Sequence, residues 1–198
     1  SMKKTIIAAS VAAASLSGCQ MTPEPKQITI GETGYTVTRT DSEVAAEFSF
    51  DSINDYMADL NTKASQNLWS KDKLSKEVDF VRDTFGNGTF TVTAYSYSLG
   101  EASDGYICAL LVQNLEAIDK SCMNGIASTP SGRGDYSDRW WNISTLLTSK
   151  LDTTEPFEIR VNSSVTHKMT RFKFEPTSHA NQLTPVSYTH LTLPTNKA

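Results

Sequence analysis

The chain is poor in the residues that most often build catalytic and metal centres. It has three histidines and three cysteines among 198 residues, and His190 lies close to the C-terminal end. We find no Gly-x-Ser-x-Gly elbow, no glycine-rich phosphate loop and no His-Glu-x-x-His motif. No Cys/His group has zinc spacing. We therefore expect no metal and no cofactor, and we assign no catalytic residue.

Basic residues are also in the minority. The chain has 18 Lys and Arg against 22 Asp and Glu, and leaving out Lys3, Lys4 and Lys197 gives 15 against 22, a net charge of −7. Proteins that bind nucleic acid need basic patches, so we expect no nucleic-acid partner. The same charge disfavours adhesion to anionic lipid headgroups.

Long apolar runs are missing except for a short one at the N-terminus. Lys3 and Lys4 precede an apolar stretch over 5–16, which is shorter than the ~20 residues that span a bilayer. It ends in Leu16-Ser17-Gly18-Cys19, which resembles the lipobox of bacterial lipoproteins. The alternative is an ordinary signal peptide with a chance cysteine.

The resemblance implies an address for the protein. Residues 1–18 would be a signal peptide, with Ser1 extraneous, and Cys19 would carry acyl chains such as palmitate. Gln20 is not the aspartate that retains lipoproteins in the inner membrane, so the resemblance implies the periplasmic leaflet of the outer membrane. Residues 19–26, with Pro23 and Pro25, are then the lipidated cysteine and an extended tether.

The C-terminal end has an unusual sequence. Residues 186–195, VSYTHLTLPT, resemble one reading frame of the adapter used in transposase-based DNA library preparation. We therefore treat 186–198 as a non-native tail and expect a single domain over 27–185, possibly truncated at its C-terminus. A natural polar tail is the alternative.

Two cysteines remain once Cys19 carries lipid. An even pair in an exported chain predicts a Cys108–Cys122 disulfide, with two buried free thiols as the alternative. The apolar run 106–112 fits a strand or a helix. Fourteen residues of helix would separate the cysteines by ~21 Å, whereas bridged Cα atoms lie within ~7 Å, so the bond favours a strand that turns back.

Hydrophobic periodicity predicts an α+β domain. We expect an antiparallel sheet with two or three helices packed on one side, because strands precede and follow the helices. The expected strands are 27–30 with 35–39 as a hairpin, 43–50, 89–98, 106–112, 157–162 and 165–174; the expected helices start at Asp51 or Ser52, at Leu74 and at Trp140, the last ending at Leu151. Glycines 100 and 105 bound a predicted turn, and 125–138 is a predicted loop.

The most distinctive internal stretch follows that loop. It carries Tyr136, Arg139, Trp140 and Trp141, and aromatic and arginine side chains dominate binding hot spots. Flat rings with polar edges also suit sugars such as glycan strands. The alternative is that at least one tryptophan packs a helix onto the sheet. We expect a non-catalytic binding or assembly module of the cell envelope, with an envelope protein or glycan as partner. A hydrolase acting on glycan or peptide, whose site assembles only in space, is the second hypothesis.

Overall fold

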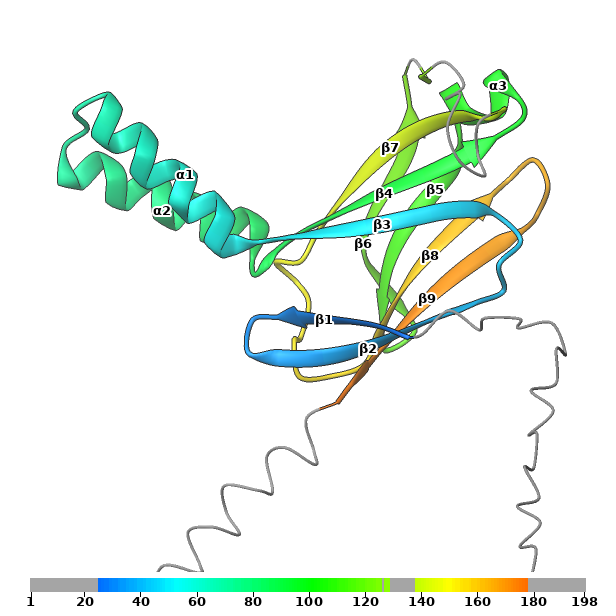
Figure 1. Cartoon of the computed structure of the whole chain (residues 1–198), viewed down its shortest axis with the longest axis horizontal. Helices are drawn as coiled ribbons and strands as arrows, with labels where there is room; N and C mark the ends of the chain where they lie inside the picture. The colour runs from blue at the N-terminus through cyan, green and yellow to red at the C-terminus, as the bar shows by residue number, and fades with distance from the viewer. Residues whose placement is uncertain (1–24, 126, 129–137, 178–198) are drawn as a thin grey trace, which may run out of the picture.

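A computed structural model describes residues 25–125, 127–128 and 138–177 (Figure 1). Two antiparallel sheets form its body. The six-stranded sheet has the order β1 (Lys26–Ile30), β2 (Thr33–Thr40), β9 (Met169–Pro176), β8 (Phe157–Ser163), β5 (Asp104–Gln113), β6 (Glu116–Asn124); the three-stranded sheet has the order β3 (Ala45–Ser52), β4 (Gly88–Ser96), β7 (Trp140–Leu147). The helices are α1 (Ile53–Gln66), α2 (Lys71–Phe85) and α3 (Leu99–Ser103). The predicted signal peptide, Cys19, Gln20, Tyr136 and the tail 186–198 lie outside the described residues.

The predicted α+β class is confirmed, and most of the predicted strands are present. The β1–β2 hairpin, β3, β4 and the antiparallel β8–β9 pair lie where alternation placed them. The run 106–112 belongs to strand β5, as favoured above. The predicted turn over 100–105 is instead mostly a one-turn helix, α3, which contains Gly100 and has Ser98 as its N-cap. Strand β9 begins at Met169, four residues later than predicted, because 164–168 form the turn.

An aromatic core fills the space between the two sheets. Inward-facing phenylalanines of β3 and β4 meet those of β8 and β9, and Phe157 stacks on Phe174 with ring centroids 4.3 Å apart. Phe174 is fully buried and also contacts Phe48 and Phe90. Burial of large aromatic side chains from both sheets supplies most of the hydrophobic stabilisation here.

The position of the helices differs from the expectation. Helices α1 and α2 form an antiparallel pair, here called the arm, which is inserted between β3 and β4 and projects beyond the sheets (Figure 1). Gly88 allows the insertion, because a Cβ there would lie 2.1 Å from the carbonyl oxygen of Asp51. The inner face of the six-stranded sheet is therefore covered by the smaller sheet. No helix among the described residues is long and apolar enough to cross a bilayer.

The predicted helix over 140–151 is wrong. Residues 140–147 form strand β7, which pairs with β4 through Trp141 opposite Tyr95 and Leu146 opposite Phe90. Ser144 and Leu146 are buried, whereas Ile143 and Thr145 are exposed, which is the alternation of a strand. Pairing with β4 thus overrides a spacing of apolar residues that also fits a helix.

The predicted disulfide is confirmed. Cys108 of β5 and Cys122 of β6 lie directly opposite each other, with sulfur atoms 2.11 Å apart. Both side chains are on the outer face of the six-stranded sheet, because Ile107, Ala109 and Met123 point into the core. The bond therefore ties edge strand β6 to the sheet.

The two long sides of the sandwich are closed differently. On one side β6 contacts β7: Asp119 Oδ2 accepts the Leu147 amide at 2.6 Å, and Ser144 Oγ donates to the carbonyl of Ser121 at 3.3 Å. We call this side the closed flank. On the other side β3 is a sheet edge that faces the β1–β2 hairpin without pairing to it. We call this side the open flank and define it by Lys26, Ile28, Arg39, Phe48 and Phe50.

Candidate binding surface

Aromatic side chains gather on the outer face of the three-stranded sheet. Tyr95 and Trp141 are directly opposite each other on β4 and β7, and both are half-buried. The Tyr95 hydroxyl donates to Glu47 Oε2 on β3 at 3.3 Å. Each strand contributes alternate residues to this face, which explains why Tyr95 of β4 points away from the core; Tyr97 follows directly after the strand.

Arg139 and Tyr97 extend this aromatic row. The guanidinium carbon lies 4.5 Å from the centre of the Tyr97 ring, and Nη2 donates to the Tyr97 hydroxyl at 3.0 Å. Tyr97 is 72% exposed, which is high for a large aromatic side chain. We call Tyr95, Tyr97, Arg139 and Trp141 the aromatic face. The cation–π contact holds the arginine flat against the ring and leaves the remaining ring surface accessible.

A shallow cavity of about 270 Å³ adjoins the aromatic face. Tyr95, Tyr97 and Arg139 line one side, and Glu101 and Lys168 supply charges of opposite sign. Glu101 Oε2 accepts from Ser96 at 2.8 Å and Oε1 accepts from Ser163 at 2.5 Å. Rings, a carboxylate and cations thus lie within one small region, a composition typical of sites for polar ligands.

The predicted binding residues do not all share one surface. Arg139 and Trp141 lie on the aromatic face, whereas Trp140 pairs with buried Ser96 on the inner side of β7. Tyr136 lies outside the described residues. Sequence reasoning grouped the two tryptophans with Tyr136 and Arg139 because their composition is typical of binding hot spots. In a strand, adjacent side chains point to opposite faces, so the two tryptophans separate.

The described residues offer little support for hydrolysis. Ser163 is buried and its hydroxyl is held by Glu101, so it is placed as a structural tie and not as an exposed nucleophile. His167 is exposed in the β8–β9 turn, and within the described ranges it makes no hydrogen bond to a serine or a carboxylate. His179 lies outside those ranges. The Glu101 carboxylate is within hydrogen-bond reach of the Ser163 hydroxyl, and within the described ranges no histidine is hydrogen-bonded to either group.

Tyr35 has a strongly raised pKa. It lies far from the aromatic face in sequence, and its side chain is part of the core. Burial raises the pKa of Tyr35 to about 12, and the nearby carboxylates of Asp152 and Glu155 add to the effect. Its hydroxyl donates to the carbonyls of Thr153 at 2.5 Å and Glu155 at 3.1 Å. Tyr35 thereby fastens the 148–156 connection to β2.

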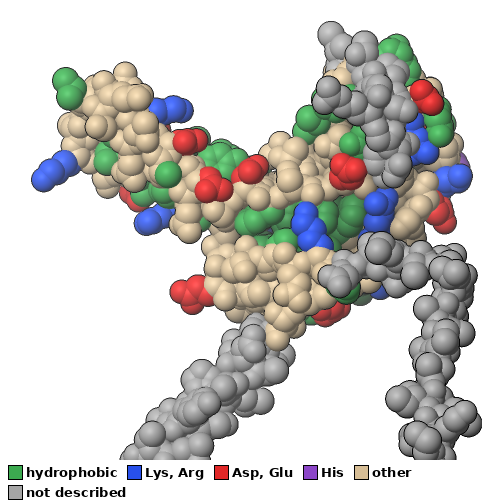
Figure 2. All heavy atoms as spheres, in the orientation of Figure 1, with side chains coloured by type: hydrophobic (Ala, Val, Ile, Leu, Met, Phe, Trp, Pro, Cys, Tyr) green, Lys and Arg blue, Asp and Glu red, His purple; other side chains and the backbone are tan. Residues whose placement is uncertain are grey.

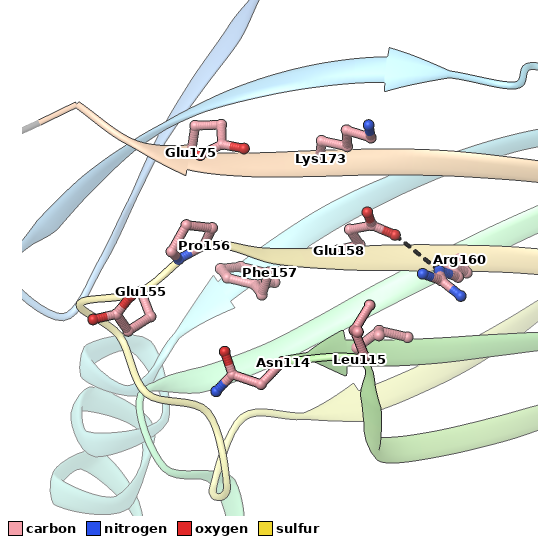
Figure 3. A pocket seen from close by; sticks show the side chains of 10 residues that line it. Asn114, Leu115, Glu155, Pro156, Phe157, Glu158, Arg160, Lys173 and Glu175 are labelled. Atoms are coloured by element: carbon pink, nitrogen blue, oxygen red, sulfur yellow. Dashed lines mark hydrogen bonds and ion pairs between the residues drawn. The ribbon is translucent and has the colours of Figure 1, made fainter.

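A second cavity, of about 420 Å³, opens on the outer face of the six-stranded sheet (Figure 3). Glu158 and Arg160 of β8 form an ion pair at 2.8 Å, and Lys173 and Glu175 of β9 lie beside them. The charges largely neutralise one another. Ion pairs that stay partly in contact with water contribute little to the free energy of folding. We assign no ligand to this cavity.

Among the described residues, no three or more His, Cys, Asp or Glu side chains lie close enough together to hold a metal ion. Comparisons with family models, curated proteins and solved structures find no match to this chain. The argument for function therefore depends on the residues themselves.

Sequence reasoning missed part of the aromatic face. The alternation of 89–98 already set Tyr95 and Tyr97 on a face opposite Phe90 and Val92. It did not indicate that Trp141 would lie beside them, because that requires β7 to be a strand paired with β4.

Proposed function

We propose that this protein is a lipid-anchored, non-catalytic binding module of the bacterial cell envelope, held on the periplasmic leaflet of the outer membrane. The Leu16-Ser17-Gly18-Cys19 sequence carries the proposed address. The Cys108–Cys122 disulfide supports an exported chain, because disulfides persist in oxidising compartments such as the periplasm.

The aromatic face carries the proposed binding function. The Tyr97 ring lines the same cavity as the charged Arg139, Glu101 and Lys168, and Trp141 lies opposite Tyr95 on the neighbouring strand. Ring faces take the apolar side of a sugar, and the charged groups bond its hydroxyls. We therefore propose a glycan strand of the cell wall as the ligand.

The address is tested by metabolic labelling. Cells expressing the protein are fed an alkyne fatty acid, and the wild-type chain is expected to take up label and to fractionate with the outer membrane. Cys19→Ser is expected to abolish the label. A wild-type protein that stays unlabelled, or that is recovered in the soluble periplasm, contradicts the proposal.

Binding is tested separately with purified cell-wall glycan strands. Trp141→Ala is expected to weaken binding by about tenfold or more, as removal of a hot-spot aromatic does. Trp69→Ala on the arm is the matched control and is expected to leave binding unchanged, since Trp69 stacks with Lys73 far along the chain from this face. Equal affinities for wild type and Trp141→Ala would contradict the assignment.

A further inference from the structure

The open flank leaves part of a strand edge without a partner. In β3 the backbone groups of odd-numbered residues pair with β4, and those of even-numbered residues point to the free edge. Two contacts show that the even-numbered backbone groups face away from β4. The Phe48 carbonyl accepts from Lys26 Nζ at 3.4 Å, and the Val44 amide donates to Thr170 Oγ1 at 2.9 Å. Within the described part of the chain, the edge amides of Phe48 and Phe50 have no strand beside them, whereas Ala46 is fully buried.

Apolar side chains are exposed along the same edge. Phe48, Phe50 and Ile28 are only partly buried, although they pack against the central core cluster. Figure 2 shows hydrophobic atoms at the surface between β3 and the β1–β2 hairpin, with Lys and Arg side chains lying over them. An accessible strand edge beside accessible apolar side chains is the arrangement to which extended segments bind.

Two cations complete the open flank. Lys26 Nζ lies 4.3 Å from the centre of the Phe48 ring, and the Arg39 guanidinium carbon lies 5.4 Å from that of Phe172. Among the described residues neither side chain forms a salt bridge, whereas Arg160 and Arg171 both have carboxylate partners. In a chain with an acidic excess, these two unpaired charges favour a partner that brings carboxylates.

We infer that the open flank binds an extended, acidic segment of another protein, which adds a strand to the free edge of β3. Its backbone would pair with Phe48 and Phe50, alternate apolar side chains would cover the exposed phenylalanines, and carboxylates would meet Lys26 and Arg39. This site is separate from the aromatic face and does not depend on the lipid anchor.

The test uses the purified full chain and a synthetic peptide of about ten residues in which valine alternates with glutamate. We expect one peptide per chain, with slower hydrogen exchange at Phe48 and Phe50 on binding. The double variant Lys26→Glu/Arg39→Glu is expected to bind the peptide at least about tenfold more weakly. Lys63→Glu/Lys71→Glu, on exposed positions of the arm, makes the same charge change and is expected to bind like wild type.

A second peptide tests the backbone pairing without altering the protein. Methylation of alternate peptide nitrogens removes the donors that face β3, and this form is expected not to bind. The inference is overturned if the methylated peptide or a valine–lysine peptide binds equally well, or if the valine–glutamate peptide does not bind at millimolar concentration. It is equally overturned if protection appears on β1 or β6, or if the free chain dimerises and protects the amides of Phe48 and Phe50.

Discussion

The two flanks of the sandwich differ in how the outer edges of the three-stranded sheet are covered. On the closed flank two outward backbone groups of β7 have partners in other elements: the Leu147 amide donates to Asp119, and the Trp141 carbonyl accepts from Ser128 at 2.9 Å. On the open flank β3 is tied at its start by Thr170, and beyond that start Lys26 is the one described residue whose side chain bonds its edge. A covered edge contributes to folding, whereas an uncovered one is available to another chain.

This difference also separates stability from function. The residues that close the sandwich are buried or hydrogen-bonded, and their loss is expected to lower the free energy of unfolding. The residues of the open flank and of the aromatic face are partly exposed, and changes there are expected to affect binding more than folding.

Replacing core phenylalanines should lower the free energy of unfolding the most. The loss should differ between the centre of the core and the open flank. Phe174→Ala is expected to cost about 3–5 kcal/mol, the usual range for a fully buried phenylalanine. Phe48→Ala is expected to cost less, because its side chain is already partly in water at the open flank. Urea unfolding of both variants measures this, and equal losses would show that the open flank is as tightly packed as the core centre.

Breaking the disulfide tests the strand that closes the other flank. Cys122→Ser opens a loop with a separation of 14 residues, for which chain entropy alone predicts a loss of about 3 kcal/mol. Reducing the wild-type protein should produce the same loss, and reductant should have no further effect on the variant. Mass spectra of the unreduced and reduced protein are expected to differ by the mass of two hydrogens. Thiols that alkylate without reductant would disprove the bond.

Alkaline pH should weaken the end of the sandwich that Tyr35 fastens. Its folded-state pKa of about 12 lies above the ordinary value of 10.0, so the folded state favours the neutral phenol. Its contribution to stability is complete below pH ~10 and is lost as the pH rises through ~12. Tyr35→Phe is expected to cost about 0.5–1.5 kcal/mol near neutral pH, since two part-buried carbonyls lose the donor that they share. The variant should also show a smaller decline between pH 10 and 12, measured by thermal melts; an identical decline would contradict the assignment.

Deleting the tail should have the smallest effect. If 186–198 are foreign to this fold, their removal is expected to change stability by no more than the ~0.5 kcal/mol typical of surface changes. Melting curves of the two chains measure this. A large drop would show that the tail, with His190, Leu191 and Leu193, belongs to the folded protein.

Local patterns predicted the strands whose alternation is clear and whose turns are marked. The β1–β2 hairpin turns at Gly31, and α2 ends at Gly86, which has a φ of 61°. Strand β7 was missed because Ile143, Leu146 and Leu147 satisfy helical and strand spacing alike, and only the partner strand β4 decides between them. Strand β6 was missed because its residues are mostly polar and only Met123 is fully buried.

The candidate sites were predictable only in part for the same reason. Arg139 and Trp141 belong to the segment that its aromatic and arginine composition singled out. Their neighbour Tyr97 follows strand β4, more than forty residues earlier in the chain. The open flank joins Lys26, Arg39 and Phe48 from three strands. The sequence around each of these residues does not indicate a binding site. Sequence patterns with a period of two or 3.6 residues describe one element at a time, so surfaces assembled from several elements need the fold.

Hydrogen exchange in the free protein tests the difference between the flanks most directly. The account predicts that the edge amides of Phe48 and Phe50 exchange at least about tenfold faster than the Leu147 amide, which Asp119 holds at 2.6 Å on the closed flank. Both sets lie on outer edges of the same three-stranded sheet, so global unfolding affects them alike. Equal protection of Phe48 and Leu147 would mean that the edge of β3 is already covered, and the open flank would not be a binding site.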